Sequence, residues 1–243
     1  MIPVAGLEAV RAQYRLEPLQ RPEQEKTRLI GYLSEAELRR GARLLDSGKR
    51  EEFLVGRGLL REILAGLVVE EPGRLVFAEG QFGKPYLAAG QVAEGLRFNV
   101  SHAGGQLLVA VCYGAEIGVD LEEVRQDLAF RPMAERYFSV REREELFGLD
   151  PRQQLEAFYR CWTRKEAYMK AAGSGFSQPS TGFDVSLRPG EPAALLGHGA
   201  DPTEVNRWRL ADLPVPAGYC AALAVNSSPR RGEVGRGDVP SNC

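Results

Sequence analysis

Two carboxylates lie two residues apart in the segment Ile117-Gly118-Val119-Asp120-Leu121-Glu122. If this segment is a strand, Asp120 and Glu122 project from one face and the apolar side chains beside them from the other. Adjacent carboxylates repel each other unless a positive charge lies between them, and their oxygen atoms are the ligands that Mg²⁺ and Mn²⁺ prefer. The pair therefore predicts either a divalent-cation site or two solvated acids on an exposed edge strand.

A third carboxylate, Glu166, interrupts an otherwise apolar stripe on a predicted long helix. A carboxylate on such a face is costly unless it is paired with a base or bound to a metal. Glu166 is therefore either a third metal ligand or the partner of Lys165 or Lys170. Residues 160–170 carry four bases against one acid, whereas residues 116–127 carry five acids against one base. The apolar members of the stripe are Leu155, Phe158, Tyr159, Trp162 and Met169.

Acids that hold a metal beside lysines and arginines are typical of phosphate chemistry, because basic groups take up the phosphate charge that the metal leaves. Two further segments fit such an anionic ligand. Gly83-Lys84-Pro85 places a lysine, a rare residue type in this chain, in a rigid turn. Ser101 and His102 follow a predicted strand and are expected at the mouth of a glycine-containing loop. They would donate hydrogen bonds to a phosphate, unless His102 is an ordinary loop histidine.

The composition limits the class of protein. The chain has 243 residues, 31 basic and 33 acidic side chains and a net charge of −2, which argues against a general nucleic-acid or membrane-surface binder. Its four cysteines show no CxxC spacing, and its two histidines cannot build a multi-histidine zinc site. Because there is no recognisable leader and no apolar run of about 20 residues, a cytoplasmic protein with reduced thiols is expected.

Capping signals predict where the helices that carry these residues begin. Ser-x-x-Glu capping boxes stand at Ser34 and Ser139, and the first should begin a helix that includes Leu45. Another helix is predicted from about residue 50, where Arg57 on the apolar face is either a snorkelling side chain or an anion ligand. A long helix should run from Asp150 to about residue 172.

The order of elements favours an α+β fold with antiparallel sheets over a doubly wound sheet. A break near residues 113–116 would divide the chain into halves 1–114 and 115–225, between which no convincing sequence repeat is evident. Residues 226–243 are rich in Ser, Pro, Gly and Arg and are expected to form a disordered tail. Strands are expected within 4–19 and at 75–77, 96–100, 107–112, 117–121, 183–187, 207–210 and 219–225.

Three of these segments together resemble the signature motifs of the 4′-phosphopantetheinyl transferases. They are Phe98–His102, Gly118–Glu122 and Phe158–Gly175, and the last is similar to the family pattern W-x-x-K-E-(A/S)-x-x-K-x-x-G. The chain length resembles that of the monomeric, surfactin-synthetase-activating (Sfp-like) type. The resemblance implies two similar α+β halves related by a pseudo-twofold axis. Each half would be a small antiparallel sheet packed with helices, and coenzyme A would bind in the cleft.

The resemblance also implies roles for individual residues. Asp120, Glu122 and Glu166 match the Mg²⁺ ligands around the coenzyme A pyrophosphate, and Glu122 is the one that some members do not use directly. Glu166 also matches the residue proposed as general base, and Lys165 and Lys170 match lysines that face the pyrophosphate. The residues that match ligands of the nucleotide phosphates are Lys84, Ser101 and His102, together with Arg40 and Arg57 near the 3′-phosphate.

The implied reaction transfers phosphopantetheine from coenzyme A to a serine of an apo acyl, peptidyl or aryl carrier protein and releases 3′,5′-adenosine diphosphate. Such carriers serve polyketide, nonribosomal peptide and fatty-acid synthesis. Mg²⁺ or Mn²⁺ would neutralise the pyrophosphate, Lys165 or Lys170 would stabilise the transition state, and Glu166 would accept the serine proton. An acidic carrier helix could dock on a mixture of arginines and apolar groups, unless the apolar ones pack in the core. These residues are Phe130, Arg131, Pro132, Met133, Arg136 and Tyr137.

Two other functions stay open on the residues alone. The same carboxylates could serve another Mg²⁺-dependent enzyme of phosphate esters, such as a hydrolase, but that function needs a water-activating group and leaves the basic positions unexplained. The chain could also be a non-catalytic module that binds coenzyme A or a carrier protein. The intact carboxylates and Lys170 argue against such a module.

Overall fold

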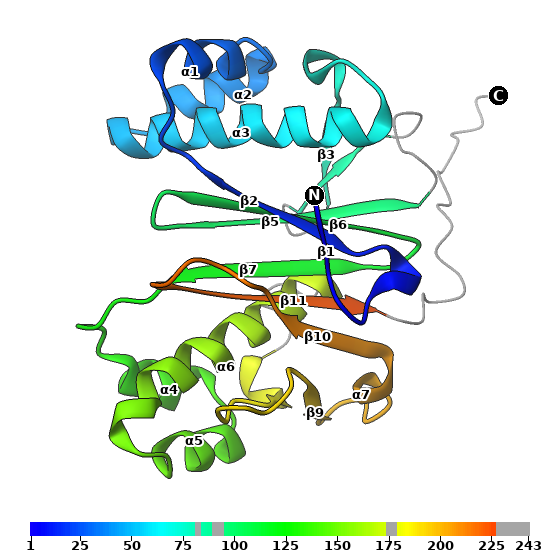
Figure 1. Cartoon of the computed structure of the whole chain (residues 1–243). Helices are drawn as coiled ribbons and strands as arrows, with labels where there is room; N and C mark the ends of the chain where they lie inside the picture. Colours follow the sequence, from blue (N-terminus) through cyan, green and yellow to red (C-terminus); the bar gives the residue numbers. More distant parts are fainter. Residues whose placement is uncertain (81–83, 89–94, 174–178, 227–243) are drawn as a thin grey trace, which may run out of the picture.

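Two stacked antiparallel sheets form the middle of the molecule in a computed structural model, which describes residues 1–80, 84–88, 95–173 and 179–226 (Figure 1). The first sheet contains β1 (Ile2–Pro3), β2 (Gln13–Pro18), β6 (Gln106–Tyr113) and β5 (Leu96–Ala103), in this order. The second contains β10 (Trp208–Asp212), β11 (Tyr219–Asn226) and β7 (Ile117–Glu123). Two-stranded sheets pair β3 (Phe77–Glu79) with β4 (Pro85–Leu87), and β8 (Phe183–Val185) with β9 (Leu195–His198).

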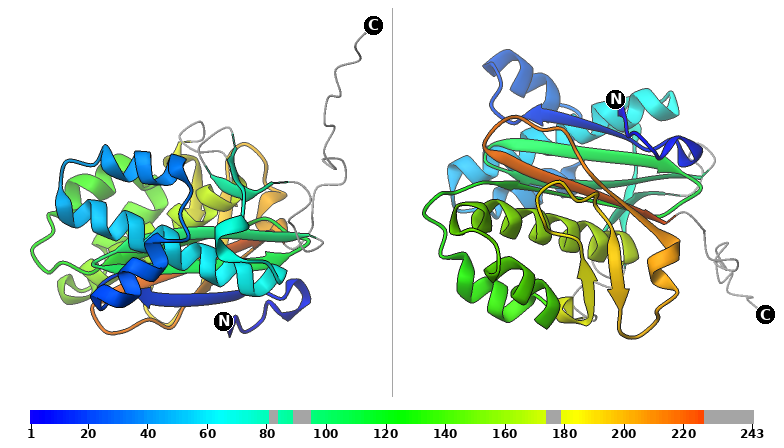
Figure 2. Two further views of the ribbon diagram at one scale, coloured as in Figure 1. Left: turned by 90° about the horizontal axis from the view of Figure 1, so that it is seen from above. Right: turned by 60° about the horizontal axis from the view of Figure 1, so that its bottom comes forward.

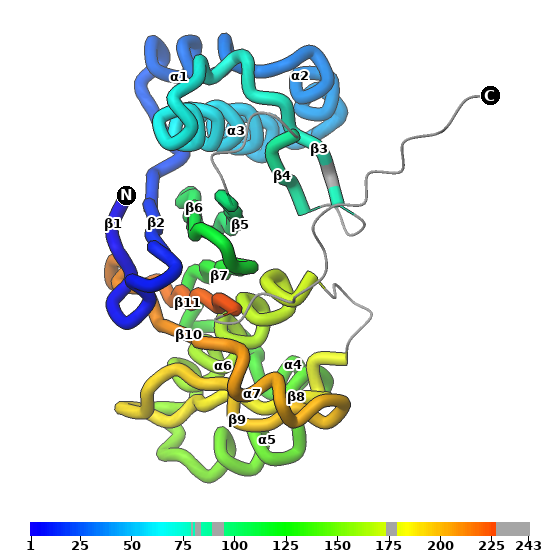
Figure 3. Tube along the Cα trace, turned by 90° about the vertical axis from the view of Figure 1, so that its right-hand side faces the viewer, coloured from blue at the N-terminus to red at the C-terminus, as the bar shows by residue number. Residues whose placement is uncertain are grey.

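Helices cover the outer face of each sheet, so the layers run helix, sheet, sheet, helix (Figure 3). Above the first sheet lie α1 (Glu23–Ile30), α2 (Glu35–Ala42) and α3 (Ser47–Val68), which Figure 2 also shows from above. Beyond the second sheet lie α4 (Phe130–Tyr137), α5 (Val140–Phe147) and α6 (Pro151–Ala172). The short elements are η1 (Glu8–Val10), η2 (Pro72–Arg74), η4 (Ser180–Gly182) and α7 (Glu204–Arg207).

The alternation of side chains along the strands produces these layers. On β6, Leu107 and Val109 pack against α3, whereas Leu108 and Ala110 pack between the two sheets. Both faces of β6 are therefore buried, which explains its continuous apolar sequence. Among the described residues, no helix is long and apolar enough to cross a membrane.

The order of elements occurs twice along the chain. The series β2, α1, α2, α3, β3, β4, β5, β6 is followed by β7, α4, α5, α6, β8, β9, β10, β11. Within the sheets, β2-β6-β5 corresponds to β7-β11-β10, and α3 and α6 each have 22 residues. The α+β class and the two similar halves are thus confirmed. A short sequence repeat accompanies them, Tyr-Leu-Ser-x-x-Glu at 32–37 and Tyr-Phe-Ser-x-x-Glu at 137–142, and both capping boxes are formed.

Several sequence predictions differ from the structure in detail. Helix α2 ends at Ala42 and leaves Leu45 97% exposed, because Asp46 accepts a hydrogen bond from the backbone of Lys49 and begins α3. The one strand expected within residues 4–19 is confirmed as β2, and the 3-10 turn η1 precedes it. Helix α1 was not predicted, because Pro22 precedes it without a side-chain cap. The predicted turn residue Gly83 and the tail 227–243 lie outside the described residues.

Candidate active site

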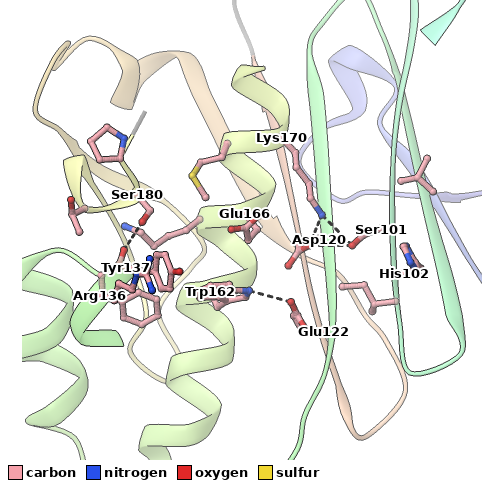
Figure 4. Close-up of a pocket in the computed structure, with 17 residues that line it drawn as sticks. Ser101, His102, Asp120, Glu122, Arg136, Tyr137, Trp162, Glu166, Lys170 and Ser180 are labelled. Atoms are coloured by element: carbon pink, nitrogen blue, oxygen red, sulfur yellow. Dashed lines mark hydrogen bonds and ion pairs between the residues drawn. The ribbon is translucent and has the colours of Figure 1, made fainter. Parts of the chain in front are cut away.

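A cavity of about 750 Å³ lies between β7, α6 and the segments around residues 137 and 180 (Figure 4). Asp120, Glu122 and Glu166 all line it, so the structure brings together the three carboxylates that the sequence singled out. Lys170 and Ser101 line the same cavity. Ser101 and His102 lie at the end of β5, next to the turn at residues 104–105, as the sequence predicted.

The strand geometry of β7 directs the two acids toward α6. Val119 and Leu121 are buried in the core between the sheets, so Asp120 and Glu122 project to the opposite face. Their expected common face is confirmed, because both side chains line the cavity beside α6.

Gly118 permits α6 to lie directly against β7. A Cβ atom at this position would be 2.2 Å from the carbonyl oxygen of Ala167 and 2.3 Å from the nitrogen of Ala171, both backbone atoms of α6. Such distances are far inside van der Waals contact, so a larger residue would push the helix away. The glycine therefore allows Glu166 and Lys170, on the same helix, to reach the acidic strand.

Asp120 is the centre of the polar contacts in the cavity. Its Oδ1 accepts hydrogen bonds from Lys170 Nζ at 2.6 Å and from Ser101 Oγ at 3.1 Å. Its Oδ2 is buried and has no hydrogen-bond partner within the described part of the chain. Burial raises the pKa of Asp120 even though the Lys170 charge opposes this change. An unpaired buried carboxylate oxygen is an atom that a bound cation could satisfy.

The other two acids are also in surroundings that disfavour their charge. Burial, and then the charge of Asp120, raise the pKa of Glu122 to about 7, although Trp162 Nε1 donates a hydrogen bond to its Oε1 at 3.1 Å. Burial and Asp120 likewise raise the pKa of Glu166. These pKa values rise because burial and the charge of Asp120 outweigh the single positive charge of Lys170. As they stand, no three acidic, His or Cys side chains of the described residues are close enough to complete a metal site.

Lys165 does not face this acidic cluster. Its Nζ donates to both carboxylate oxygens of Glu142 at 2.7 Å and to the carbonyl oxygen of Phe183 at 2.7 Å. The side chains of Lys165 and Glu142 are only 3% and 1% exposed. Arg164 is fully buried and pairs with Asp212, whose side chain is half exposed. The bases of α6 therefore do not form one common surface, because the ammonium of Lys165, although this residue lines the cavity, is held by Glu142, and Arg164 is bound into the core.

Lys84 also lies away from the acidic cavity. Its Nζ donates to the carbonyl oxygens of Ile117 at 2.8 Å and Lys170 at 3.3 Å, and it is 3.5 Å from the Glu116 carboxylate. Burial lowers the pKa of Lys84. The contact of Lys84 with a nucleotide phosphate, which the resemblance implied, stays a prediction. Lys84 connects the start of β7 to the end of α6, the two elements that carry the site.

A second, basic cavity of about 510 Å³ lies between α3 and β5 and includes Arg40 and Arg57. His102 and Val100 line both cavities, so the two are contiguous. Strand alternation on β5 explains this position, because His102 points toward α3 and its neighbour Ser101 toward β7. The structure thus brings Arg40, Arg57 and His102 together, beside the acids rather than among them.

Three residues of the site were not predicted from the sequence. The sequence placed Trp162 in the apolar stripe of the long helix, yet it lies one turn before Glu166 and donates a hydrogen bond to Glu122. Asn99 accepts a hydrogen bond at 2.9 Å from the backbone of Val119 and so joins β5 to β7. A buried amide in an apolar strand could have been noticed, because such a group needs a partner. Lys49, which lines the basic cavity, had no local signal.

Comparison with known proteins identifies the family. Residues 116–224 match the family model of the 4′-phosphopantetheinyl transferase superfamily. The 4′-phosphopantetheinyl transferase HetI of Nostoc sp. is 40% identical over 209 residues, which cover 86% of this chain and 84% of HetI. The chain belongs to the 4′-phosphopantetheinyl transferases. A transferase from Bacillus subtilis is 30% identical over 199 residues, covering 82% of this chain and 86% of that protein. The predicted family is therefore confirmed.

One solved structure aligns with part of the chain. A holo-(acyl-carrier-protein) synthase from Bacillus anthracis, in complex with coenzyme A (3′,5′-ADP), aligns with a TM-score of 0.37 and 22% identity. The alignment covers 46% of this chain and 94% of that one.

The predicted docking segment of this phosphopantetheinyl transferase divides into two sets. Phe130, Met133 and Tyr137 are partly buried and pack on the core of the second half. The apolar residues of the segment thus follow the second of the two possibilities, packing in the core rather than docking. Arg136 is exposed and lines the acidic cavity. Arg131 is exposed beside Pro132, although it donates a hydrogen bond to Gln154 at 3.0 Å and lies over the Phe147 ring.

Proposed function

We propose that this chain transfers the 4′-phosphopantetheine arm of coenzyme A to a serine of an apo carrier protein and releases 3′,5′-adenosine diphosphate. The observation that carries the proposal is the acidic cavity, in which Lys170 pairs with Asp120 and which adjoins a basic cavity at His102. Coenzyme A has two separate anionic groups, a pyrophosphate and a 3′-phosphate. Two adjoining cavities of this kind suit one molecule that carries both, and membership of the family supports the same ligand.

The acidic cavity would hold a divalent cation through Asp120, Glu122 and Glu166. The unpaired Oδ2 of Asp120 and the raised pKa values of all three groups support this assignment. A bound Mg²⁺ or Mn²⁺ would neutralise the pyrophosphate and make its phosphorus easier to attack.

Glu166 would accept a proton in this reaction, and Lys170 would stabilise negative charge. The carrier serine oxygen forms a bond to the β-phosphorus, and the bond from this phosphorus to the bridging oxygen breaks. Glu166 accepts the serine proton, which suits a carboxylate whose pKa is raised toward neutrality and which has no hydrogen-bond partner among the described residues. Lys170 Nζ stabilises the charge that develops on the phosphate oxygens.

The carrier protein would approach over the exposed arginines beside the cavity. Arg136 at the cavity and Arg131 on the same helix, α4, offer positive charge to an acidic carrier helix. The monomeric state, the cytoplasmic location and the choice among polyketide, nonribosomal peptide and fatty-acid carriers stay predictions from the sequence.

One incubation tests this function. The chain, an apo carrier protein, coenzyme A and MgCl₂ are combined, and the carrier is measured by intact mass. The expected result is a gain of one phosphopantetheine group. Loss of coenzyme A without that gain would indicate a hydrolase, and binding without either would indicate a non-catalytic module.

A substitution separates the role of Glu166 from its effect on folding. Glu166→Gln should melt like the wild type and lose transfer by roughly 10²- to 10⁴-fold, the usual contribution of a general base. Glu156→Gln is the matched control, because Glu156 lies on α6 and pairs with Arg160 at the surface. Near wild-type turnover of Glu166→Gln would contradict the assignment of Glu166 as the proton acceptor.

A further inference from the structure

Glu37 is a buried carboxylate that joins the start of α2 to two arginines of α3. Its Oε2 accepts from the Ser34 backbone at 2.8 Å and from Arg61 at 2.6 and 2.9 Å. Its Oε1 accepts from Arg57 Nε at 2.7 Å. One oxygen is therefore held by the capping box and Arg61, and the other is directed to Arg57.

The two arginines lie one turn apart but are used differently. Arg61 is 2% exposed, and its terminal nitrogens donate to Glu37 and to the carbonyl oxygens of Pro72 and Leu75. Its donors are engaged within the protein, so Arg61 is structural. Arg57 donates only through Nε to a described residue, while it lines the basic cavity with its guanidinium over the Phe77 ring at 4.6 Å.

The charges around the basic cavity favour a doubly charged anion. Arg40, Lys49 and Arg57 line it, and Glu52 is the acidic residue among its lining side chains. Because Glu37 uses Nε of Arg57, the two terminal nitrogens of Arg57 keep the planar pair of donors that matches two phosphate oxygens. The phenyl ring beneath and the carboxylate beside it hold this guanidinium in one orientation.

We propose that Glu37 is a positioning residue, which orients Arg57 so that the basic cavity selects coenzyme A by its 3′-phosphate. This inference rests on the proposed function, because that function places the pyrophosphate at the acidic cavity and leaves the 3′-phosphate as the second anion. Lys49 has no side-chain partner among the described residues and lacks such a support. Replacing Lys49 should therefore change the ratio of the KM values for coenzyme A and dephospho-coenzyme A less than replacing Arg57.

The test compares coenzyme A with dephospho-coenzyme A, which lacks only the 3′-phosphate. The ratio of the two KM values is measured for the wild type, Arg57→Ala, Glu37→Gln and Arg57→Lys. Each variant should raise the KM for coenzyme A by roughly tenfold, the value expected for one charge-assisted hydrogen bond, and leave the KM for dephospho-coenzyme A unchanged. Arg57→Lys keeps the charge, but one ammonium cannot serve Glu37 and the phosphate with the same geometry.

Glu62→Gln is the matched control, because Glu62 lies on α3 and pairs with Arg28 at the surface. It should leave both KM values unchanged. An Arg57→Lys variant with the wild-type ratio, or a Glu37→Gln variant that melts normally and keeps that ratio, would overturn the proposal. If Glu37→Gln does not fold, Arg57→Lys decides alone.

A binding measurement separates this inference from the proposed function. Calorimetry with 3′,5′-adenosine diphosphate and with adenosine 5′-monophosphate reports the 3′-phosphate contribution without a carrier protein. If the wild type transfers nothing, the proposed function fails, yet a preference for the diphosphate that Arg57→Lys abolishes still supports the role of Glu37 and Arg57. Equal affinity of the wild type for both nucleotides would overturn it.

Discussion

Lys165 and Lys170 lie five residues apart on α6, and the structure predicts opposite consequences of replacing them with methionine. Lys165 is paired with Glu142, and both side chains are almost fully buried. Lys170 is 31% exposed and contacts Asp120 in the acidic cavity. The first substitution should therefore lower the free energy of unfolding, and the second should lower the rate of transfer.

The size of each effect follows from these contacts. In Lys165→Met, the Glu142 carboxylate keeps the backbone N–H groups of Ser139 and Val185 but loses its charge partner. Removing one partner of a buried pair costs about 3–5 kcal/mol. At about 2–4 °C per kcal/mol for a chain of this size, Tm should fall by about 6–20 °C. The double variant with Glu142→Gln should recover part of this loss, because no unpaired charge stays buried.

Lys170→Met should affect stability less, because Lys170 is 31% exposed and because Asp120, whose pKa burial already raises, can take up a proton when its charge partner is lost. Its effect on kcat should instead be about 10²- to 10³-fold, as for the loss of one group that stabilises transition-state charge. Urea unfolding gives the first quantity, and the intact-mass assay below the melting temperature gives the second. A Lys165→Met variant of unchanged stability and lost activity would refute this assignment and favour a contact of Lys165 with the phosphate.

Other substitutions and conditions test the remaining parts of the site. Gly118→Ala should lower Tm and transfer together, because its Cβ would overlap the Ala167 carbonyl at 2.2 Å, and thermal melting with the transfer assay measures both. The folded-state pKa of Glu122, about 7, lies above its ordinary 4.5, so the stability that this group contributes is present below pH 4.5 and lost as pH rises through 7. Added Mg²⁺ should therefore raise Tm more at pH 8 than at pH 6, and an equal shift at both would contradict a metal among these acids. Arg136→Glu should raise the KM for the carrier protein and leave the KM for coenzyme A unchanged. Steady-state kinetics with each substrate varied in turn measures both values. A raised KM for coenzyme A alone would indicate that Arg136 binds the nucleotide instead.

The sequence alone determined the features that depend on local backbone geometry. Two capping boxes and a Pro after Asp150 mark helix starts, because a side chain can cap only the few N–H groups that follow it. The two-residue period of a strand placed Asp120 and Glu122 on one face. The motifs also sufficed for the family, since their residue types and spacing are a property of the chain itself.

Only the tertiary structure decided which charged side chains meet. Lys165 and Lys170 differ little in local sequence, but Glu142 lies 23 residues before Lys165 and reaches it only when α5 packs on α6. Lys84 likewise meets carbonyl groups of two distant elements, that of Ile117 on β7 and that of Lys170 on α6. The pairing of a flexible base depends on which carboxylate or carbonyl the fold brings within about 3 Å, and such distances are set by packing between elements rather than by the period of any one of them.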